Sequence, residues 1–438
     1  MSNFENKKIC ILGFGKEGKA TYNYIRKYEL LLPITIMDKK YKEIELDDPY
    51  VTLMDTNYDV LKEFDMIFKT PGISLNDIDI TPFKDKITSQ LEYFLENTKA
   101  YTIGITGTKG KSTTSSLMYK ILADQGMKTY LVGNIGNPIL DILDETDENT
   151  YVVLELSAHQ LEYIKHSVNI GIVLNLYEEH LDHFKSLEHY YDSKMNMALF
   201  QKRGDHFIFN ADNDALWNYT KENKYKGTLY EVSENTNDSY AYMDKNYIYI
   251  EKKNMFDINT EINLTGRHNL VDIMFTIAAS SILKLDMTKV TNSIKEFMPL
   301  EHRLELVGKY NEVIYYNDSI STIPETCINA IEALKNVNTL ILGGMDRGID
   351  YNKLIMFLRM SSVENVICMP DTGLKIMEEI KDVKKTFAVK DVEEAVKVAN
   401  KVTKKNMICL LSPAASSYNL YKNFEERGKV FKDAVRKL

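Results

Sequence analysis

Residues 101–114, with the sequence YTIGITGTKGKSTT, combine the residue types that bind a nucleoside triphosphate. A β-like apolar run, 101–105, meets a glycine-containing turn, 107–110, and a helix-compatible run extends over 115–123. The backbone amides of such a loop and the first turn of the following helix bind phosphate oxygens. The order of strand, glycine loop, Lys-Ser and helix therefore predicts a nucleotide triphosphate site.

Two side chains of this loop carry the expected chemistry. Lys111 would reach the β- and γ-phosphates, and the Ser112 hydroxyl would bind Mg²⁺. The spacing differs from the strict G-x-x-x-x-G-K-[ST] pattern, because Ile105 stands where the first glycine is expected. The alternative is a glycine turn that only joins a strand to a helix, but the Gly-Lys-Ser-Thr combination favours the phosphate loop.

Three residues further along could complete a metal site. Glu155 ends an apolar run in LELSAHQLE, His180 follows another in NLYEEHLDHF, and Lys194 lies in a helical run, YYDSKMNMAL. Ligands collect at the carboxyl ends of parallel strands, so Glu155 and His180 are expected beside the phosphate loop. A carboxylate suits Mg²⁺ well, since this ion prefers oxygen ligands. On the residue pattern alone, His180 could equally be a hydrogen-bonded loop residue, and Lys194 a solvated lysine on a helix.

A second glycine motif lies near the N-terminus. The sequence KICILGFGKEG places a short strand before Gly13, Gly15 and Gly18, and a second strand ends at Asp38. This is a G-x-G-x-x-G pattern with an acidic residue about 20 positions further on. It predicts a Rossmann-like unit that binds a nucleotide, without saying which nucleotide.

The rest of the chain alternates between strand-like and helix-like segments. A third strand, 65–68, leads to Thr70-Pro71-Gly72, which is either a loop over a phosphate or only a turn. Between 229 and 264, short Tyr- and Ile-rich runs separated by Asn/Asp turns predict antiparallel strands at the edge of a sheet. Further strands are expected at 34–37, 129–132, 151–156, 170–175, 312–317, 339–343, 366–369, 384–389 and 407–411, and helices at 19–27 and 392–402.

This alternation predicts an α/β chain of three domains. We expect a Rossmann-like domain over 1–97 and a central phosphate-loop sheet with a small antiparallel sheet over 98–299. A second Rossmann-like domain is expected over 300–438. The length of 438 residues suits this division, because a domain commonly holds about 100–200 residues.

Composition narrows the class of protein. A hydrophobic content of 44% and a charged content of 27% are ordinary for a folded soluble chain. No apolar run approaches the roughly 18 residues of a membrane helix, and the start, MSNFENKKIC, lacks the features of a signal peptide. We therefore expect a cytoplasmic protein without a membrane partner. The net charge of −9 argues against broad nucleic-acid binding. The scattered cysteines predict buried thiols and neither a disulfide framework nor a metal site; they are Cys10, Cys327, Cys368 and Cys409.

These motifs resemble the Mur ligase family, and the resemblance covers essentially the whole chain. It rests on GITGTKGKSTT, GNIGNP, ELSAHQLE, NLYEEHLDH, GRHN, EHRLE, NDS, LGGMDRGIDY and LLSPAASSYNLYKNFEERGKVF. The last stretch is the most specific, because its combination of residues is hard to meet by chance. The resemblance implies a cytoplasmic, ATP-dependent amide ligase of peptidoglycan precursor synthesis, which adds D-glutamate to UDP-N-acetylmuramoyl-L-alanine through an acyl-phosphate. We expect a monomer.

The resemblance also implies a role for each site residue. The residues that match Glu155 and His180 hold Mg²⁺ in the family, and the lysine that matches Lys194 is carbamylated, so two Mg²⁺ sites are implied. The implied catalytic residues are Lys111, Glu155, His180 and Lys194, and the implied metal ligands are Ser112, Glu155, His180 and Lys194.

Three sets of substrate contacts follow from the same resemblance. The implied contacts of the UDP-substrate are Gly15, Lys16, Asp38, Thr70, Pro71, Gly72, Asn134, Ser157 and Gln160. Those of ATP are Gly107, Thr108, Lys109, Gly110, Lys111, Ser112, Thr113, Asn269, Arg303 and Asp318. Those of glutamate are Thr322, Arg347, Ser417 and Phe424.

The chain departs from the family pattern at three positions. The stretch 318–325 reads DSISTIPE, and Ile320 stands where the family usually has a lysine near the reacting phosphate and the incoming amino acid. Arg347 replaces a usual lysine of the glutamate pocket, and its planar fork can bind a carboxylate through two hydrogen bonds. Asp272 stands where an asparagine is usual. The amino acid is therefore D-glutamate or, alternatively, L-glutamate or another acidic amino acid.

Three other classes of protein fit parts of this sequence less well than the ligase does. Gly13-Phe14-Gly15 alone would fit an oxidoreductase, but that class does not need an ATP loop. A non-catalytic nucleotide-binding protein of cell-wall assembly would be expected to have lost Lys111, Glu155, His180 or Lys194, and all four are present. A ligase that adds glutamate to folate would not be expected to carry the N-terminal glycine domain.

Overall fold

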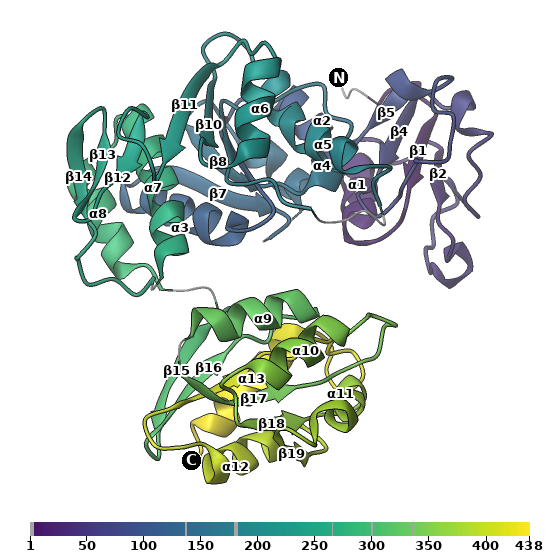
Figure 1. The fold of residues 1–438 in the computed structure, drawn as a ribbon. Coiled ribbons are helices and arrows are strands. Elements are labelled where there is room, and N and C mark those ends of the chain that lie inside the picture. The colour runs from purple at the N-terminus through teal and green to yellow at the C-terminus, as the bar shows by residue number, and fades with distance from the viewer. Residues whose placement is uncertain (1–3, 136–137, 179–182, 265, 299–300, 335) are drawn as a thin grey trace. The chain divides into compact units, whose positions relative to one another are not determined.

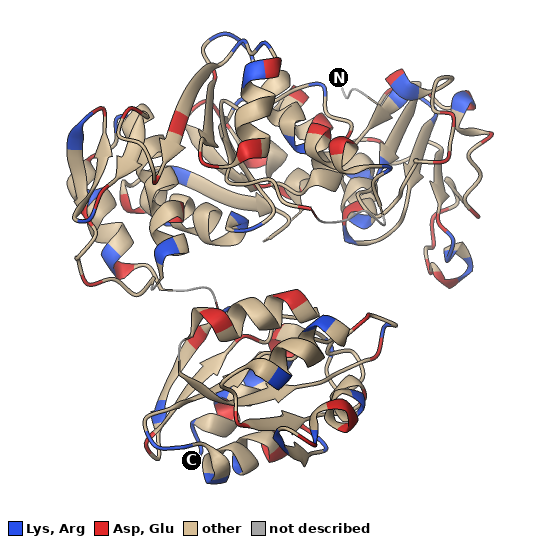
Figure 2. Cartoon of the chain, in the orientation of Figure 1, with Lys and Arg blue, Asp and Glu red and all other residues tan. Residues whose placement is uncertain are grey.

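The computed structural model describes residues 4–135, 138–178, 183–264, 266–298, 301–334 and 336–438. The chain divides into two compact units, Met1–Phe297 and Met298–Leu438 (Figure 1). Lys/Arg and Asp/Glu positions are interspersed along the helices and loops of both units (Figure 2). Among the described residues, no helix is both long and apolar enough to span a bilayer.

The first sheet of unit 1 is five-stranded and parallel, with the strand order β3-β2-β1-β4-β5. This is the order of the first five strands of a dinucleotide-binding fold. Each strand is short and β1 is fully buried, which is why the sequence shows continuous apolar runs here. The elements are β1 (Ile9–Leu12), α1 (Lys16–Tyr28), β2 (Ile34–Met37), β3 (Val51–Met54), β4 (Met66–Lys69), β5 (Ile87–Thr88) and α2 (Gln90–Asn97).

The second sheet of unit 1 is nine-stranded, with the order β14-β13-β12-β11-β10-β9-β6-β8-β7. Its central strands are parallel and carry the glycine loop at their carboxyl end. The first elements are β6 (Tyr101–Thr106), α3 (Lys111–Asp124), β7 (Lys128–Gly133), β8 (Thr150–Glu155), α4 (Ala158–Leu161), β9 (Ile170–Val173), α5 (Leu187–Leu199), β10 (His206–Asn210) and α6 (Asp214–Glu222). The remaining ones are β11 (Thr228–Ser233), β12 (Ala241–Met243), β13 (Tyr247–Ile250), β14 (Lys253–Asp257), α7 (Arg267–Ile282) and α8 (Met287–Glu296).

The prediction of antiparallel strands at a sheet edge in 229–264 is confirmed for β12, β13 and β14, whereas the small antiparallel sheet is not a sheet of its own. β12, β13 and β14 pair antiparallel, but they continue the large sheet instead of forming their own. β11 pairs parallel with β10, because the helix α6 lies between them and makes a crossover connection. The short turns after β12 and β13 have no room for a helix, so these strands return antiparallel.

Unit 2 holds a six-stranded sheet with the order β15-β16-β20-β17-β18-β19. All pairs are parallel except β15 with β16. Two apolar cores lie within this unit, one including Leu410 and the other Phe431. The elements are β15 (Glu305–Tyr310), β16 (Val313–Asn317), α9 (Pro324–Ala333), β17 (Val337–Leu342), α10 (Asn352–Met360), β18 (Asn365–Cys368), α11 (Thr372–Ile380), β19 (Lys385–Ala388), α12 (Val392–Val402), β20 (Ile408–Leu411) and α13 (Phe424–Val435).

The α/β class and three sheets agree with the sequence analysis, and the helix predicted at 392–402 has those bounds. The prediction of buried, unbridged thiols is confirmed for all four cysteines. The strands β3, β5, β10 and β15 were not predicted. The division of unit 1 at residue 97 and the functions assigned to the three domains stay predictions.

Candidate active site

The glycine loop joins β6 to α3 in a conformation that depends on Gly110. This residue precedes the helix with a φ of 87°, in the left-handed region that favours glycine. A Cβ at this position would lie 2.5 Å from Oδ1 of Asp272, so the loop and the start of α7 are in close contact. The predicted loop residues therefore form one tight turn at the carboxyl end of β6.

Lys111 is the first residue of α3, and its side chain turns back over the loop. Its ammonium group donates hydrogen bonds to the carbonyl oxygens of Gly107 at 2.8 Å and Thr108 at 3.0 Å. The following residues, Ser112 and Thr113, are both buried in the first turn of the helix. A cation and a helix N-terminus thus share one small region, which is the arrangement that binds phosphate oxygens.

The segment after β9 holds the loop in place. Asn175 accepts from the amide of Thr108 through its carbonyl oxygen, and from the amide of Lys109 through its side chain, at 3.1 and 2.8 Å. The Thr108 hydroxyl in turn accepts from the amide of Tyr177 at 3.0 Å. His180 lies three residues beyond Tyr177 and falls outside the described residues, so its predicted role stays a prediction.

Glu155 ends β8 and is buried beside α3. Its Oε1 accepts from the Asn134 side-chain amide at 2.9 Å, and its Oε2 lies 3.4 Å from the Ser115 hydroxyl. Within the described residues, no Lys or Arg forms an ion pair with this carboxylate. A buried carboxylate with only neutral hydrogen-bond partners fits a site that receives a divalent cation.

Lys194 lies on α5 and is 2% exposed, so the alternative of a solvated helix lysine is wrong. Its Nζ donates to the Gly107 carbonyl oxygen at 3.0 Å and lies 5.0 Å from the centre of the Tyr190 ring. A second contact, at 3.4 Å, is with the Thr106 hydroxyl. The structure therefore brings Lys194 directly against the phosphate loop.

The N-terminal glycine motif is tied together by Asp38 and Thr70. Asp38 accepts from the amides of Phe14 and Lys40, both at 2.8 Å. The Thr70 hydroxyl donates to the carbonyl oxygen of Leu12 at 3.0 Å. A Cβ at Gly13 would lie 2.1 Å from that hydroxyl oxygen, so glycine is required here. Gly15 caps α1 and Lys16 begins it, beside these two loops.

A polar bridge connects α4 with α1 inside unit 1. Ser157 and Gln160 form a capping box at the start of α4. The Gln160 side-chain amide also donates to Oε1 of Glu17, on α1, at 3.0 Å. Burial raises the pKa of Glu17, and this hydrogen bond opposes the shift. The bridge places the predicted residues Ser157 and Gln160 alongside the start of α1; Glu17 itself was not predicted.

The same interface contains a buried charge cluster that sequence reasoning missed. The Lys69 ammonium lies 3.3 Å from Oε2 of Glu162, and both side chains are buried. Nε2 of His183 lies 3.6 Å from Oε2, and Nε2 of His189 lies 3.5 Å from Oε1. The signal available in the sequence was a lysine directly before Thr70-Pro71-Gly72, at the end of an apolar run.

Unit 2 contains the predicted glutamate residues and two predicted ATP residues. The segments of Arg347 and Ser417 adjoin through a bridge in which the Met345 amide donates to the Ser416 carbonyl oxygen at 2.8 Å. Asp318 is buried and accepts from the Ser412 hydroxyl at 2.8 Å. Burial raises the pKa of the Asp318 carboxyl to about 6.

The other predicted contacts of glutamate and of ATP outside the glycine loop lie near α9, α13, β15 and α7. Thr322 lies just before α9, Phe424 is the first residue of α13, and Arg303 precedes β15. Asn269 lies on α7 in unit 1.

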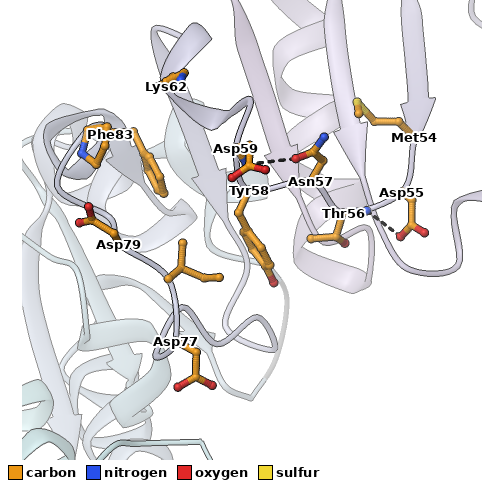
Figure 3. Close-up of a pocket in the computed structure, with 12 residues that line it drawn as sticks. Met54, Asp55, Thr56, Asn57, Tyr58, Asp59, Lys62, Asp77, Asp79 and Phe83 are labelled. Carbon is orange, nitrogen blue, oxygen red and sulfur yellow. Dashed lines mark hydrogen bonds between the residues drawn. The ribbon is translucent and has the colours of Figure 1, made fainter.

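A cavity of about 900 Å³ lies beyond β3 and is separate from these residues (Figure 3). None of the predicted UDP-substrate contacts lines it. Its wall includes the carboxylates of Asp55, Asp59, Asp77 and Asp79, with Lys62 as the basic residue. Such a lining repels phosphate groups, so the cavity does not suit a nucleoside diphosphate.

Known proteins provide an independent comparison. Models of the Mur ligase middle domain and of the Mur ligase glutamate ligase domain match residues 105–280 and 302–415. The UDP-N-acetylmuramoylalanine–D-glutamate ligase of Clostridioides difficile is 31% identical over 452 residues, with 100% of both chains covered. The protein of the same name from Acetivibrio thermocellus is 33% identical over 462 residues, covering 99% of this chain and 97% of the relative.

Solved structures agree in fold. The MurF ligase of Thermotoga maritima, in complex with ADP, has a TM-score of 0.60 at 14% identity, with 100% of both chains covered. The UDP-N-acetylmuramate-alanine ligase MurC of the same organism also has a TM-score of 0.60, at 18% identity, with 99% of this chain and 100% of that chain covered. With both domain models matched and relatives above 30% identity over the full length, the chain belongs to the Mur ligase family.

Proposed function

We propose that this chain is the ATP-dependent ligase that adds D-glutamate to UDP-N-acetylmuramoyl-L-alanine in peptidoglycan precursor synthesis. The observation that supports it most directly is the glycine loop, where Lys111 and Lys194 converge on the Gly107 carbonyl oxygen. Full-length relatives named for this reaction supply the substrates. The chain acts in the cytoplasm as a monomer.

The reaction is a carboxylate activation followed by amide formation. An oxygen of the terminal L-alanine carboxylate attacks the γ-phosphorus of ATP, the bond to the β,γ-bridging oxygen breaks, and ADP leaves. The glutamate amine then attacks the acyl carbon, the carbon–oxygen bond to phosphate breaks, and the amine loses a proton. Two anions approach each other in the first step, so positive charge at the loop lowers the barrier. Lys111 supplies such a charge there.

The residues around the loop suit Mg²⁺. Ser112 and Glu155 would hold one ion, and His180 and a carbamylated Lys194 a second. Bound Mg²⁺ would neutralise the charge that develops on the transferring phosphoryl group. Carbamylation joins the Lys194 amine to the carbon of CO₂ and releases a proton, which turns a cation into an anion. Asn134 would orient the Glu155 carboxylate through the hydrogen bond it already makes.

The three predicted domains divide the substrates between them. Residues 1–97 would bind the UDP-substrate through the two loops that Asp38 and Thr70 organise, with Ser157 and Gln160 beside them. Residues 98–299 would bind ATP. Residues 300–438 would bring glutamate and close over ATP with Arg303 and Asp318, which orients the amine and excludes water from the acyl-phosphate.

The test is phosphate release from ATP with UDP-N-acetylmuramoyl-L-alanine, with D-glutamate and L-glutamate added in parallel. The proposal expects release with D-glutamate that depends on all three substrates. Release with neither enantiomer would remove the substrate assignment.

A second candidate reaction uses L-glutamate. The observation behind it is Ile320, whose amide donates to the His302 carbonyl oxygen at 3.1 Å in a segment where the family usually has a lysine. A missing cation changes how the two carboxylates of glutamate are held, and therefore which enantiomer presents its amine. Release with L-glutamate only would support this candidate and make 318–325 the specificity element.

A further inference from the structure

Arg427 is a buried cation in the first turns of α13. Its guanidinium donates three hydrogen bonds, to the Ser319 hydroxyl at 3.0 Å, the Ser319 carbonyl oxygen at 2.9 Å and the Ala415 carbonyl oxygen at 3.0 Å. The Ser319 hydroxyl, which accepts from Arg427, itself donates to the carbonyl oxygen of Phe424 at 2.8 Å. One side chain thus connects the loop after β16, the loop after β20 and the start of α13.

The same three segments carry predicted glutamate contacts. Thr322 lies three residues after Ser319, Ser417 lies two residues after Ala415, and Phe424 belongs to the helix of Arg427 itself. The fourth contact, Arg347, lies three residues after Gly344 in another segment.

That segment also touches the guanidinium. A Cβ built on Gly344 would lie 3.2 Å from Nη1 of Arg427. Displacing the guanidinium would therefore disturb the segments that carry the predicted glutamate contacts.

The hydrogen bonds of Arg427 that the structure describes go to neutral groups. Within the described residues, no Asp or Glu forms an ion pair with it, and its hydrogen-bond partners are neutral oxygens. Glu425 and Glu426, its neighbours on α13, are exposed. Burial lowers the pKa of Arg427 to about 10, so the side chain stays protonated at neutral pH. A buried charge without a partner is costly, unless an anionic ligand provides the partner.

We propose that Arg427 is a positioning residue that orders the amino-acid pocket and supplies positive charge at the Ser319–Ile320 segment, where the lysine usual in the family is absent. The inference rests on the proposed function, because it assigns the residue to the binding of the acidic amino acid. The positive end of α13 adds to the same field. The charge acts over a short distance in a poorly solvated region, where it is screened little.

The test compares steady-state kinetics of the wild type with R427Q, R427K and the double variant R427Q/I320K. R436Q is the matched control, since Arg436 is an exposed arginine at the end of the same helix. The proposal expects R427Q to raise the KM for glutamate about tenfold, the effect of losing one charge-assisted interaction. The KM values for ATP and for the UDP-substrate should change less than about twofold. R427K should fall between wild type and R427Q, because it keeps the charge but loses the fork.

The double variant R427Q/I320K distinguishes loss of positive charge from loss of pocket structure. If the pocket needs a cation, I320K should recover most of the lost glutamate affinity in the R427Q background. A KM for glutamate that is unchanged in R427Q, or that rises equally with the other two KM values and does not respond to I320K, overturns the proposal. If thermal unfolding shows that R427Q does not fold, the same comparison is made between R427K and R427K/I320K, and absence of rescue again overturns it. Wild-type inactivity with both glutamate enantiomers is a different outcome, because it overturns the proposed function.

Discussion

At the scale of single residues, the Gly107 carbonyl oxygen is the most informative atom of the site. Lys111 and Lys194 both donate to it, at 2.8 and 3.0 Å, so two ammonium groups share one acceptor. Two like charges this close repel each other, most strongly where water is scarce. Carbamylation of Lys194 would remove the repulsion and create a ligand for Mg²⁺. The geometry of the unmodified side chain thus gives a physical reason for the modification.

We therefore expect a carbamate on Lys194 in the presence of CO₂. Protein equilibrated with ¹³C-labelled bicarbonate should show a carbamate carbon resonance by NMR, and K194M should lack it. K99M is the control, since Lys99 is an exposed lysine away from the loop and its loss should leave the resonance in place. A resonance that persists in K194M would assign the modification to another amine.

Asp318 supports a prediction about pH. Burial raises the pKa of its carboxyl to about 6 from the ordinary value of 3.8, against opposing hydrogen bonds from Ser321 and Ser412. The folded chain therefore binds this proton more tightly than the unfolded chain. The free energy of unfolding should fall as pH rises from about 4 to 6, because the folded state holds the extra proton only in that range. A shift of about two units corresponds to about 3 kcal/mol.

D318N removes this titration and leaves an acceptor for the Leu304 amide, which now bonds to Oδ1 at 3.2 Å. Urea unfolding should show the stability of D318N, relative to wild type, increasing by up to about 3 kcal/mol between pH 4 and pH 7.5. Asp433, whose side chain is half-exposed, offers a control, D433N, which should leave the slope unchanged. A pH-independent difference between D318N and wild type would contradict the raised pKa.

At the scale of elements, residues after β9 contact two predicted functional loops of unit 1. Asn175 and Tyr177 hold the glycine loop, while His183 accepts through its carbonyl oxygen from Ser74 at 3.2 Å and from the Asn76 side chain. Ser74 and Asn76 follow the Thr70-Pro71-Gly72 loop. Described residues on either side of 179–182 therefore contact both the segment after the predicted UDP-substrate loop and the glycine loop.

The buried Lys69–Glu162 ion pair adds a side-chain contact between the end of β4 and the residue after α4. Lys69 ends β4 and Glu162 follows α4, and burial lowers the pKa of Lys69 while Glu162 opposes that shift. Replacing Lys69 with methionine leaves Glu162 buried without its lysine partner. We expect K69M to lower the free energy of unfolding by about 3 kcal/mol, and K69M/E162Q to recover much of that loss.

Urea unfolding of K69M and the double variant at pH 8 measures both effects. K99M is the matched control, because Lys99 pairs with Glu148 in an exposed position and should cost less than about 1 kcal/mol. Equal losses in K69M and K99M would show that burial does not strengthen the pair.

Local patterns predicted the elements better than the contacts between them. The strand at 34–37 and the helix at 392–402 have their predicted bounds, since apolar runs and amphipathic periodicity are local signals. β11 was assigned the wrong partner direction, because pairing depends on the connection through α6 and not on its own residues. The burial of Lys194 was invisible to helical periodicity, and only the family resemblance pointed to that lysine. Glu162 and Arg427 were missed because their partners lie 93 and 108 residues away in sequence.

At the scale of the whole molecule, each unit has the means to fold separately. Unit 1 buries Leu154 in one core, and unit 2 buries Leu410 in another. Domains with their own cores commonly unfold in separate steps. The single tryptophan of the chain, Trp217, lies in unit 1, so its fluorescence reports on that unit alone.

We expect L410A and L154A to separate the two units in urea unfolding followed by Trp217 fluorescence and by far-ultraviolet circular dichroism. Each substitution removes buried methyl groups and should cost about 2–5 kcal/mol in its own unit. L410A should move part of the circular dichroism transition to lower urea and leave the fluorescence midpoint in place, whereas L154A should move the fluorescence midpoint. If L410A shifted the Trp217 transition as far as L154A does, the chain would unfold as one cooperative body. Glutamate pocket variants such as R427Q would then be expected to weaken the ATP site as well, through stability alone. Independent midpoints instead mean that the two units unfold separately, so that a change in unit 2 does not weaken unit 1 through stability alone.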